Sequence, residues 1–141
     1  MTRSSATTSL PVSSLVGSPV ADVRPGATLV EVAKVMHAAG VGALVVRDGD
    51  GAPSGIVSER DLVEAVATGR DLSATTAGEV ARSTLVWCDE DASVAEVAAE
   101  MMDEYVRHVL VEADGRLLGV VSARDLLGVY ASEDAGPDLD G

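Results

Sequence analysis

Two short motifs in the chain combine a serine with an aspartate three residues later, and both could bind a hydroxylated or phosphorylated ligand. The first is Ser58-Glu-Arg-Asp61 and the second is Ser122-Ala-Arg-Asp125. Each follows an apolar segment that starts with glycine, so each is expected where a strand ends and a helix begins. Free backbone N–H groups at a helix start attract phosphate or hydroxyl oxygens. A carboxylate beside them can accept hydrogen bonds from the vicinal hydroxyls of a ribose.

The same pattern also has a purely structural interpretation. A serine at the N-cap with an acidic residue three positions later forms a capping box, which stabilises a helix without any ligand. Glutamate or glutamine is usual at that position, and aspartate is expected to be too short to reach back comfortably. Because the motif occurs twice in equivalent surroundings, the sequence favours a ligand site over a cap alone.

An internal repeat explains why the motif occurs twice. Residues 27–36 align with residues 92–101, and residues 55–62 align with residues 119–126, at offsets of 65 and 64 positions. The missing residue is assigned to an Asp/Gly turn, where a deletion leaves both flanking strands in register. Two units of roughly 60 residues would each be marginally stable alone, so we expect them to pack against each other.

Each unit is predicted to run strand, helix, strand, strand, helix, which is an α/β (α+β) arrangement. Capping boxes at Thr28 and Ser93 begin the first helices, and apolar residues then recur at helical spacing. The second helices are predicted at residues 61–68 and 125–131. The predicted divisions are a disordered tail (1–17), the first unit (18–72), a linker with a short helix at 77–81 (73–83), the second unit (84–131) and an acidic tail (132–141).

Composition and charge narrow the class of protein. The 141 residues are 47% hydrophobic and carry 10 basic against 23 acidic side chains, a net charge of −13. Nucleic acids and anionic membranes are therefore not expected partners. No apolar run approaches the roughly 20 residues that span a bilayer, and the first residues lack a secretory pattern, so a cytoplasmic location is expected. A single cysteine leaves no internal disulfide or multi-cysteine zinc site to expect.

The doubled Gly-h-h-Ser-x-x-Asp motif, in which h is apolar, resembles a tandem pair of CBS domains, named after cystathionine β-synthase. The resemblance covers about residues 18–131. It extends to small free-standing actinobacterial CBS-pair proteins, including the hypoxic-response type, to which the linker 76–82 contributes. It implies two units related by a pseudo-two-fold axis and packed through their sheets. It also implies two clefts that bind an adenosine ligand such as AMP, ADP, ATP or S-adenosylmethionine.

In such proteins the motif aspartate holds the ribose hydroxyls, and basic residues of the other unit face the phosphates. The resemblance assigns to the first cleft Asp61, Ser58, Arg60 and Ile56, with Arg107 and His108 from the second unit. It assigns to the second cleft Asp125, Ser122, Arg124 and Val120, opposite the uncharged Gly42 and Ala43. We therefore expect unequal sites, with an anionic nucleotide bound better at Asp61. Arg107 and His108 could instead form a surface or interface pair.

The sequence leaves three functions to compare. The first is a non-enzymatic regulatory module that binds an adenosine ligand and signals by a shift in conformation or partner surface, with an effector protein still to be identified. It needs no cofactor, and Mg²⁺ only if ATP binds. The second is a structural or protein-interaction module with vestigial clefts. The third, an enzyme, lacks support because no histidine-based triad or acid/base pair accompanies the motifs.

Further expectations concern the two second helices, the cysteine and the tryptophan. Homodimerisation is expected through the second helices, Leu62–Ala67 and Leu126–Ala131, which are apolar. Cys88 is expected to be an inert core thiol rather than a redox group. Trp87 is expected in the core, with stacking on an adenine and contact at a dimer seam as the alternatives.

Overall fold

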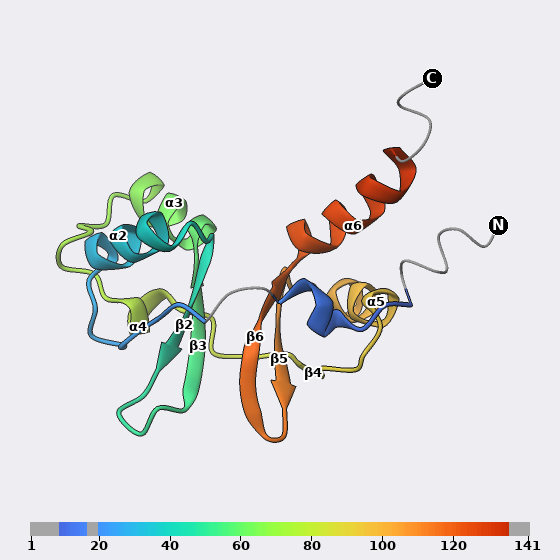
Figure 1. Cartoon of the computed structure of the whole chain (residues 1–141). Coiled ribbons are helices and arrows are strands. Elements are labelled where there is room, and N and C mark those ends of the chain that lie inside the picture. The colour runs from blue at the N-terminus through green and yellow to red at the C-terminus, as the bar shows by residue number, and fades with distance from the viewer. Residues whose placement is uncertain (1–8, 17–19, 136–141) are drawn as a thin grey trace. The chain divides into compact units, whose positions relative to one another are not determined.

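The computed structural model describes residues 9–16 and 20–135, which divide into two compact units. The first unit comprises residues 20–85. The second unit combines residues from 86 onward with the N-terminal segment 9–16. Figure 1 shows the helices and strands of both units.

The first unit is built on a three-stranded sheet of order β1-β2-β3. Strand β1 (Asp22–Val23) runs parallel to β2 (Ala43–Arg47), and β2 runs antiparallel to β3 (Pro53–Ser58). Its helices are α2 (Leu29–Ala39), α3 (Glu59–Ala67) and the single turn α4 (Ala77–Val80). Thr28 and Glu31 form the capping box that begins α2, and Gly40 ends this helix in the left-handed conformation that glycine adopts readily.

The second unit repeats this plan with the sheet order β4-β5-β6. Its strands are β4 (Trp87–Asp89), β5 (His108–Ala113) and β6 (Arg116–Ser122). Its helices are α5 (Val94–Glu104), α6 (Ala123–Ala135) and the 3-10 turn η1 (Val12–Leu15). The predicted order of strand, helix, strand, strand, helix is therefore confirmed in both units.

The two hairpins confirm where the repeat loses one residue. Both have a bulge at the same place, after the pairs Val46–Gly55 and Val111–Gly119. Beyond the bulge, the first hairpin closes through residues 48–52, whereas the second closes through Asp114 and Gly115. These two residues have φ angles of 55° and 75°. Positive φ at both positions is the geometry of a tight two-residue hairpin turn.

Each unit has its own core between the first helix and one face of the sheet. In the first unit, α2 places Leu29, Val32 and Met36 against Leu44, Val46 and Val57. In the second unit, α5 places Val94, Val97 and Met101 against Val109, Val111 and Val121. The predicted helical spacing therefore identifies the buried face of each helix correctly. Residues that alternate with these along the strands lie on the opposite face of each sheet, which we call the outer face.

The predicted disordered tail over residues 1–17 is wrong for residues 9–16. Val12 is fully buried in the core of the second unit. Its N–H donates to the carbonyl of Ala92 at 2.7 Å, and the N–H of Val94 donates to Leu10 at 3.0 Å. Apolar burial and backbone hydrogen bonds together offset the entropy that a tail would retain. Residues 1–8 and 17 lie outside the described part of the chain.

The short helix predicted within the linker at 77–81 is present as α4, whereas the predicted acidic tail is partly helical. In the first unit, Ala77 donates to Ala27 at 2.8 Å and Leu29 donates to Thr75 at 2.9 Å. These are the same two contacts, with Ala77 and Thr75 in the places of Val12 and Leu10. Segments 10–16 and 75–81 are therefore equivalent, and Ala77 is fully buried. Helix α6 continues to Ala135, so it includes the first four residues of the predicted tail. Residues 136–141 lie outside the described part.

Candidate ligand-binding site

The first Ser-x-x-Asp motif forms the junction between β3 and α3. The Oδ2 atom of Asp61 accepts hydrogen bonds from the backbone N–H of Ser58 at 2.8 Å and from its hydroxyl at 3.1 Å. The Asp61 N–H in turn is 3.4 Å from the Ser58 Oγ. Ser58 is therefore the N-cap of α3, and the motif forms a complete capping box.

The second motif forms the same junction between β6 and α6. The N–H of Ser122 donates to Asp125 Oδ2 at 2.9 Å, and the N–H of Asp125 donates to Ser122 Oγ at 3.1 Å. The expectation that aspartate is too short for a capping box is therefore wrong in both units. In the two units the aspartate Oδ2 atom lies 2.8 Å and 2.9 Å from the serine backbone nitrogen, so the shorter carboxylate reaches its cap.

Capping uses only half of each carboxylate. Within the described residues, the Oδ1 atoms of Asp61 and Asp125 make no hydrogen bond. The Asp61 side chain lies partly buried at its junction, and the Asp125 side chain is exposed. A carboxylate oxygen accepts hydrogen bonds without needing to lose a proton or move. Each junction can therefore keep its cap and still accept from a ligand hydroxyl.

A backbone contact ties each helix start to the neighbouring central strand. The N–H of Glu59 donates to the carbonyl of Gly42 at 2.9 Å, and the N–H of Ala123 donates to that of Arg107 at 2.8 Å. Gly42 and Arg107 therefore occupy equivalent places. A Cβ on Gly42 would lie 2.8 Å from Glu59 Oε1, so a side chain there would require Glu59 to move.

The residues at these equivalent positions give the two junctions different charges. The first has an acidic Glu59 next to a glycine, whereas the second has a basic Arg107 next to an alanine. Within the described residues, Arg60, Arg107 and Arg124 form no ion pair, although the chain is strongly acidic. These exposed arginines are therefore available to an anion. The predicted approach of Arg107 and His108 to a ligand at Asp61 stays a prediction.

The other predicted site residues share one sheet face within each unit. Ile56 pairs with Val45, and Ser58 pairs with Ala43, two residues further along each strand. In the second unit, Val120 pairs with Leu110 and Ser122 pairs with His108. Residues two apart point to the same side of a strand, and paired residues point to the same side of a sheet. Ile56 and Ser58 therefore lie on the outer face of the first unit, as do Val120, Ser122 and His108 in the second.

Cys88 lies on the opposite face from these residues, in the core of the second unit. Burial, followed by the negative charges of Glu100, Asp89 and Glu112, raises the pKa of its thiol from 9.0 to about 11. A thiol that stays protonated at neutral pH is a poor nucleophile and a poor metal ligand. Among the described residues, no group of three or more His, Cys, Asp or Glu side chains could hold a metal ion. No described helix is both long and apolar enough to cross a bilayer.

Two α/β units with the same strand order, register and capped junction define the chain as a tandem-repeat protein. The family model for the CBS domain matches it twice, over residues 12–68 and 77–132, so the chain belongs to the CBS-domain family. Both matches begin at the segments η1 and α4, which agrees with the equivalence of residues 10–16 and 75–81.

Two curated relatives have comparable similarity. Hypoxic response protein 1 of Mycobacterium tuberculosis is 35% identical over 100 residues, which is 70% of each chain. The uncharacterized protein MK0525 of Methanopyrus kandleri is 33% identical over 107 residues, which is 74% of this chain and 55% of that protein. The chain thus spans only about half the length of the second relative.

Two solved structures bear on ligands. CBS domain protein PAE2072 from Pyrobaculum aerophilum, in complex with AMP, is 31% identical with a TM-score of 0.76, over 90% of this chain and all of that one. The structure of Hypoxic Response Protein I with two coordinated zinc ions is 30% identical with a TM-score of 0.65, over 84% of this chain and 97% of that one.

Proposed function

We propose that the chain is a non-enzymatic regulatory module that binds an adenosine ligand at its Ser-x-x-Asp junctions. The observation that carries the proposal is the divided carboxylate of Asp61 and Asp125, in which Oδ2 caps a helix and Oδ1 makes no hydrogen bond within the described residues. In this role Oδ1 accepts from the ribose hydroxyls. The AMP complex of a protein 31% identical to the chain supports the ligand class.

The nucleotide phosphates require cations that are not already neutralised. Arg60 and Arg124 directly precede the motif aspartates, and neither forms an ion pair within the described part of the chain. We assign them to the rim of each site. Arg107 has a glycine as its counterpart, so the chain supplies one such cation, and its backbone contacts the second junction. The family resemblance assigns the Arg107 side chain to a ligand at Asp61, so we propose that the two sites differ, with AMP favoured at Asp61.

Catalysis is not part of the proposal because the motif serines are engaged in helix capping. The Ser58 hydroxyl donates to Asp61 Oδ2 and lies 3.4 Å from the Asp61 N–H, so it is part of the helix cap. The proposed role is therefore binding followed by a change in partner surface. Mg²⁺ enters only if the ligand is ATP.

We also propose that the chain forms a homodimer through its second helices. Val63 and Val66 lie three residues apart on α3 and are exposed, and Leu127 is exposed on α6. Residues at this spacing lie on one face of a helix. The alternative function, a protein-interaction dimer with vestigial sites, has the same apolar residues in its favour. Sedimentation of the chain and of a Val63→Glu, Val66→Glu variant tests the dimer, and equal molar masses would contradict it.

A thermal-shift panel of AMP, ATP, S-adenosylmethionine and NAD tests the adenosine site. Ligand at about a hundred times its dissociation constant stabilises a fold by roughly 2.7 kcal/mol, so a clear rise in melting temperature is expected for at least one compound. No response to any of them would favour the interaction module. Turnover of any of them, followed by chromatography, would show an enzyme instead.

A further inference from the structure

Trp87 does not lie in the core, which corrects the expectation for the only tryptophan of the chain. It is 37% exposed and lies on β4, an edge strand of its sheet. Its indole N–H makes no hydrogen bond with any described residue. An aromatic ring with an accessible face and a free donor is suited to stack on another ring.

The register of the sheet places Trp87 on the same face as the candidate ligand residues. Trp87 pairs with Leu110, and Leu110 pairs with Val120. The neighbouring pair on this face, one step nearer to α6, is His108 with Ser122. Trp87 therefore lies at the rim of the outer face, on the side opposite to Cys88 and the core.

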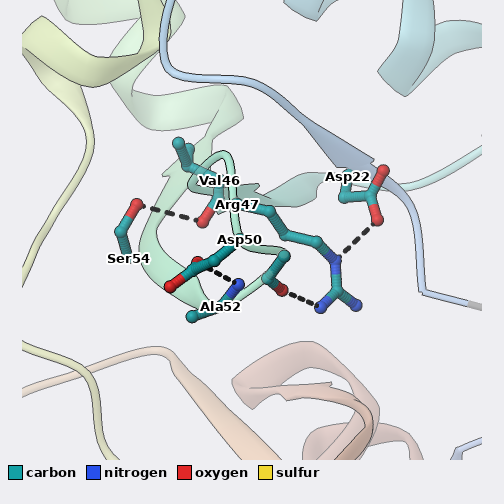
Figure 2. A network of polar contacts seen from close by, with 7 residues as sticks. Asp22, Val46, Arg47, Asp50, Ala52 and Ser54 are labelled. Carbon is teal, nitrogen blue, oxygen red and sulfur yellow. Dashed lines mark hydrogen bonds and ion pairs between the residues drawn. The ribbon is translucent and has the colours of Figure 1, made fainter.

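The equivalent position in the first unit shows that the fold does not require an aromatic residue there. Asp22 pairs with Val45, as Trp87 pairs with Leu110. Arg47 Nε donates to Asp22 Oδ2 at 2.7 Å (Figure 2). Arg47 Nη1 donates to the carbonyl of Gly51 at 2.9 Å. In the second unit Glu112 follows Val111 where Arg47 follows Val46, so this ion pair has no counterpart.

We propose that the adenine base of an adenosine ligand bound at the Ser122–Asp125 junction stacks on Trp87. The inference rests on the proposed adenosine site and adds the residue that recognises the base. Trp87 lies roughly 10 Å across and 7 Å along the sheet from Ser122, by ordinary strand spacings, a span that a nucleotide and an indole ring can bridge together. Stacking makes the chain selective for a ligand with an aromatic base over a sugar phosphate alone.

Fluorescence of the single tryptophan tests the contact directly. AMP is titrated with excitation of the indole and, in parallel, by calorimetry, and ribose 5-phosphate serves as the probe that lacks a base. We expect AMP to change the emission with the same dissociation constant that calorimetry gives. Ribose 5-phosphate is expected to leave the emission unchanged.

Two variants separate stacking from a structural role. Trp87→Leu is expected to weaken AMP binding at the Ser122–Asp125 junction about tenfold, because base–aromatic stacking has an effect of this order, whereas Trp87→Phe retains most of the affinity there. Equal affinities in all three proteins, or AMP binding without any change in emission, would overturn the stacking contact and leave the adenosine site intact. Absence of binding for AMP, ATP and S-adenosylmethionine would overturn both.

Discussion

The backbone N–H of Ser58 donates to the carboxylate of Asp61 at 2.8 Å, so the aspartate assigned to a ligand also caps helix α3. Here the two oxygens of the carboxylate can divide the roles, because Oδ2 alone completes the cap. The cap also fixes the side chain before any ligand arrives, which lowers the entropic cost of binding.

Removing the Arg107 charge should weaken phosphate binding without affecting the nucleoside. Charge-assisted hydrogen bonds contribute about 1.5–3 kcal/mol, so Arg107→Ala is expected to weaken AMP binding by at least about tenfold and to leave adenosine binding unchanged. Calorimetry with both ligands measures the difference. The control is Arg116→Ala, which removes the same charge at the exposed hairpin end of β6. An equal effect of the two substitutions would show a general electrostatic effect instead of a contact.

Trimming Val12 should destabilise the second unit although the residue precedes the first unit in the sequence. Val12→Ala removes two buried methyl groups and is expected to cost about 2 kcal/mol of unfolding free energy. Urea denaturation measures it. The control is Leu10→Ala, because Leu10 is 46% exposed and its loss should cost much less. Equal midpoints for Val12→Ala and the wild type would mean that segment 9–16 does not contribute to the core.

Two glycine substitutions are expected to change stability in opposite directions. A Cβ on Gly119 would collide with the Val16 side chain, so Gly119→Ala should destabilise the fold by roughly 1–3 kcal/mol. A Cβ on Gly128 meets nothing within 4 Å. Because Gly128 lies inside α6, Gly128→Ala should stabilise the helix by about 0.5–1 kcal/mol. Thermal unfolding distinguishes them, and a rise in melting temperature for Gly119→Ala would contradict the packing of Val16 on β6.

The Cys88 thiol should make the fold sensitive to alkaline pH. Its pKa in the fold is raised from 9.0 to about 11, so the folded state holds the proton more tightly than the unfolded chain does. The resulting stability is complete below about pH 9 and is lost as the pH rises toward 11. Urea denaturation of the wild type and Cys88→Val between pH 8 and 11 measures this. A stability difference between them that stays constant with pH would refute a buried, protonated thiol.

The sequence predicts those parts of the fold that depend on local patterns. The glutamate three residues after Thr28 and after Ser93 predicts the capping box that begins each first helix. Apolar residues at helical spacing, which end at Met36 and Met101, predict the buried face of each helix. The sequence does not reveal that segment 10–16 is equivalent to residues 75–81, because the equivalence lies in backbone contacts. The side chains at equivalent positions differ, since Val12 corresponds to Ala77 and Leu10 to Thr75. Composition alone therefore suggested a tail.

The sequence predicts which residues form the candidate site better than it predicts how their side chains are arranged. The motif identifies Asp61 and Asp125, but whether an aspartate reaches its cap depends on how the preceding strand enters the helix, which spacing does not reveal. The expectation that Trp87 lies in the core is wrong, because alternation along a three-residue strand cannot tell which face meets the core. Only its pairing with Leu110 resolves that question.

Calorimetric titration of AMP into Asp61→Asn, Asp125→Asn and the control Glu96→Gln tests the central claim most directly. Asparagine retains an acceptor for the cap but lacks the charge, whereas Glu96 caps α5 at a place with no proposed ligand. We predict a loss of AMP affinity of at least about tenfold for Asp61→Asn, a smaller one for Asp125→Asn and none for Glu96→Gln. Wild-type affinity in both aspartate variants would mean that the two carboxylates serve the helices alone.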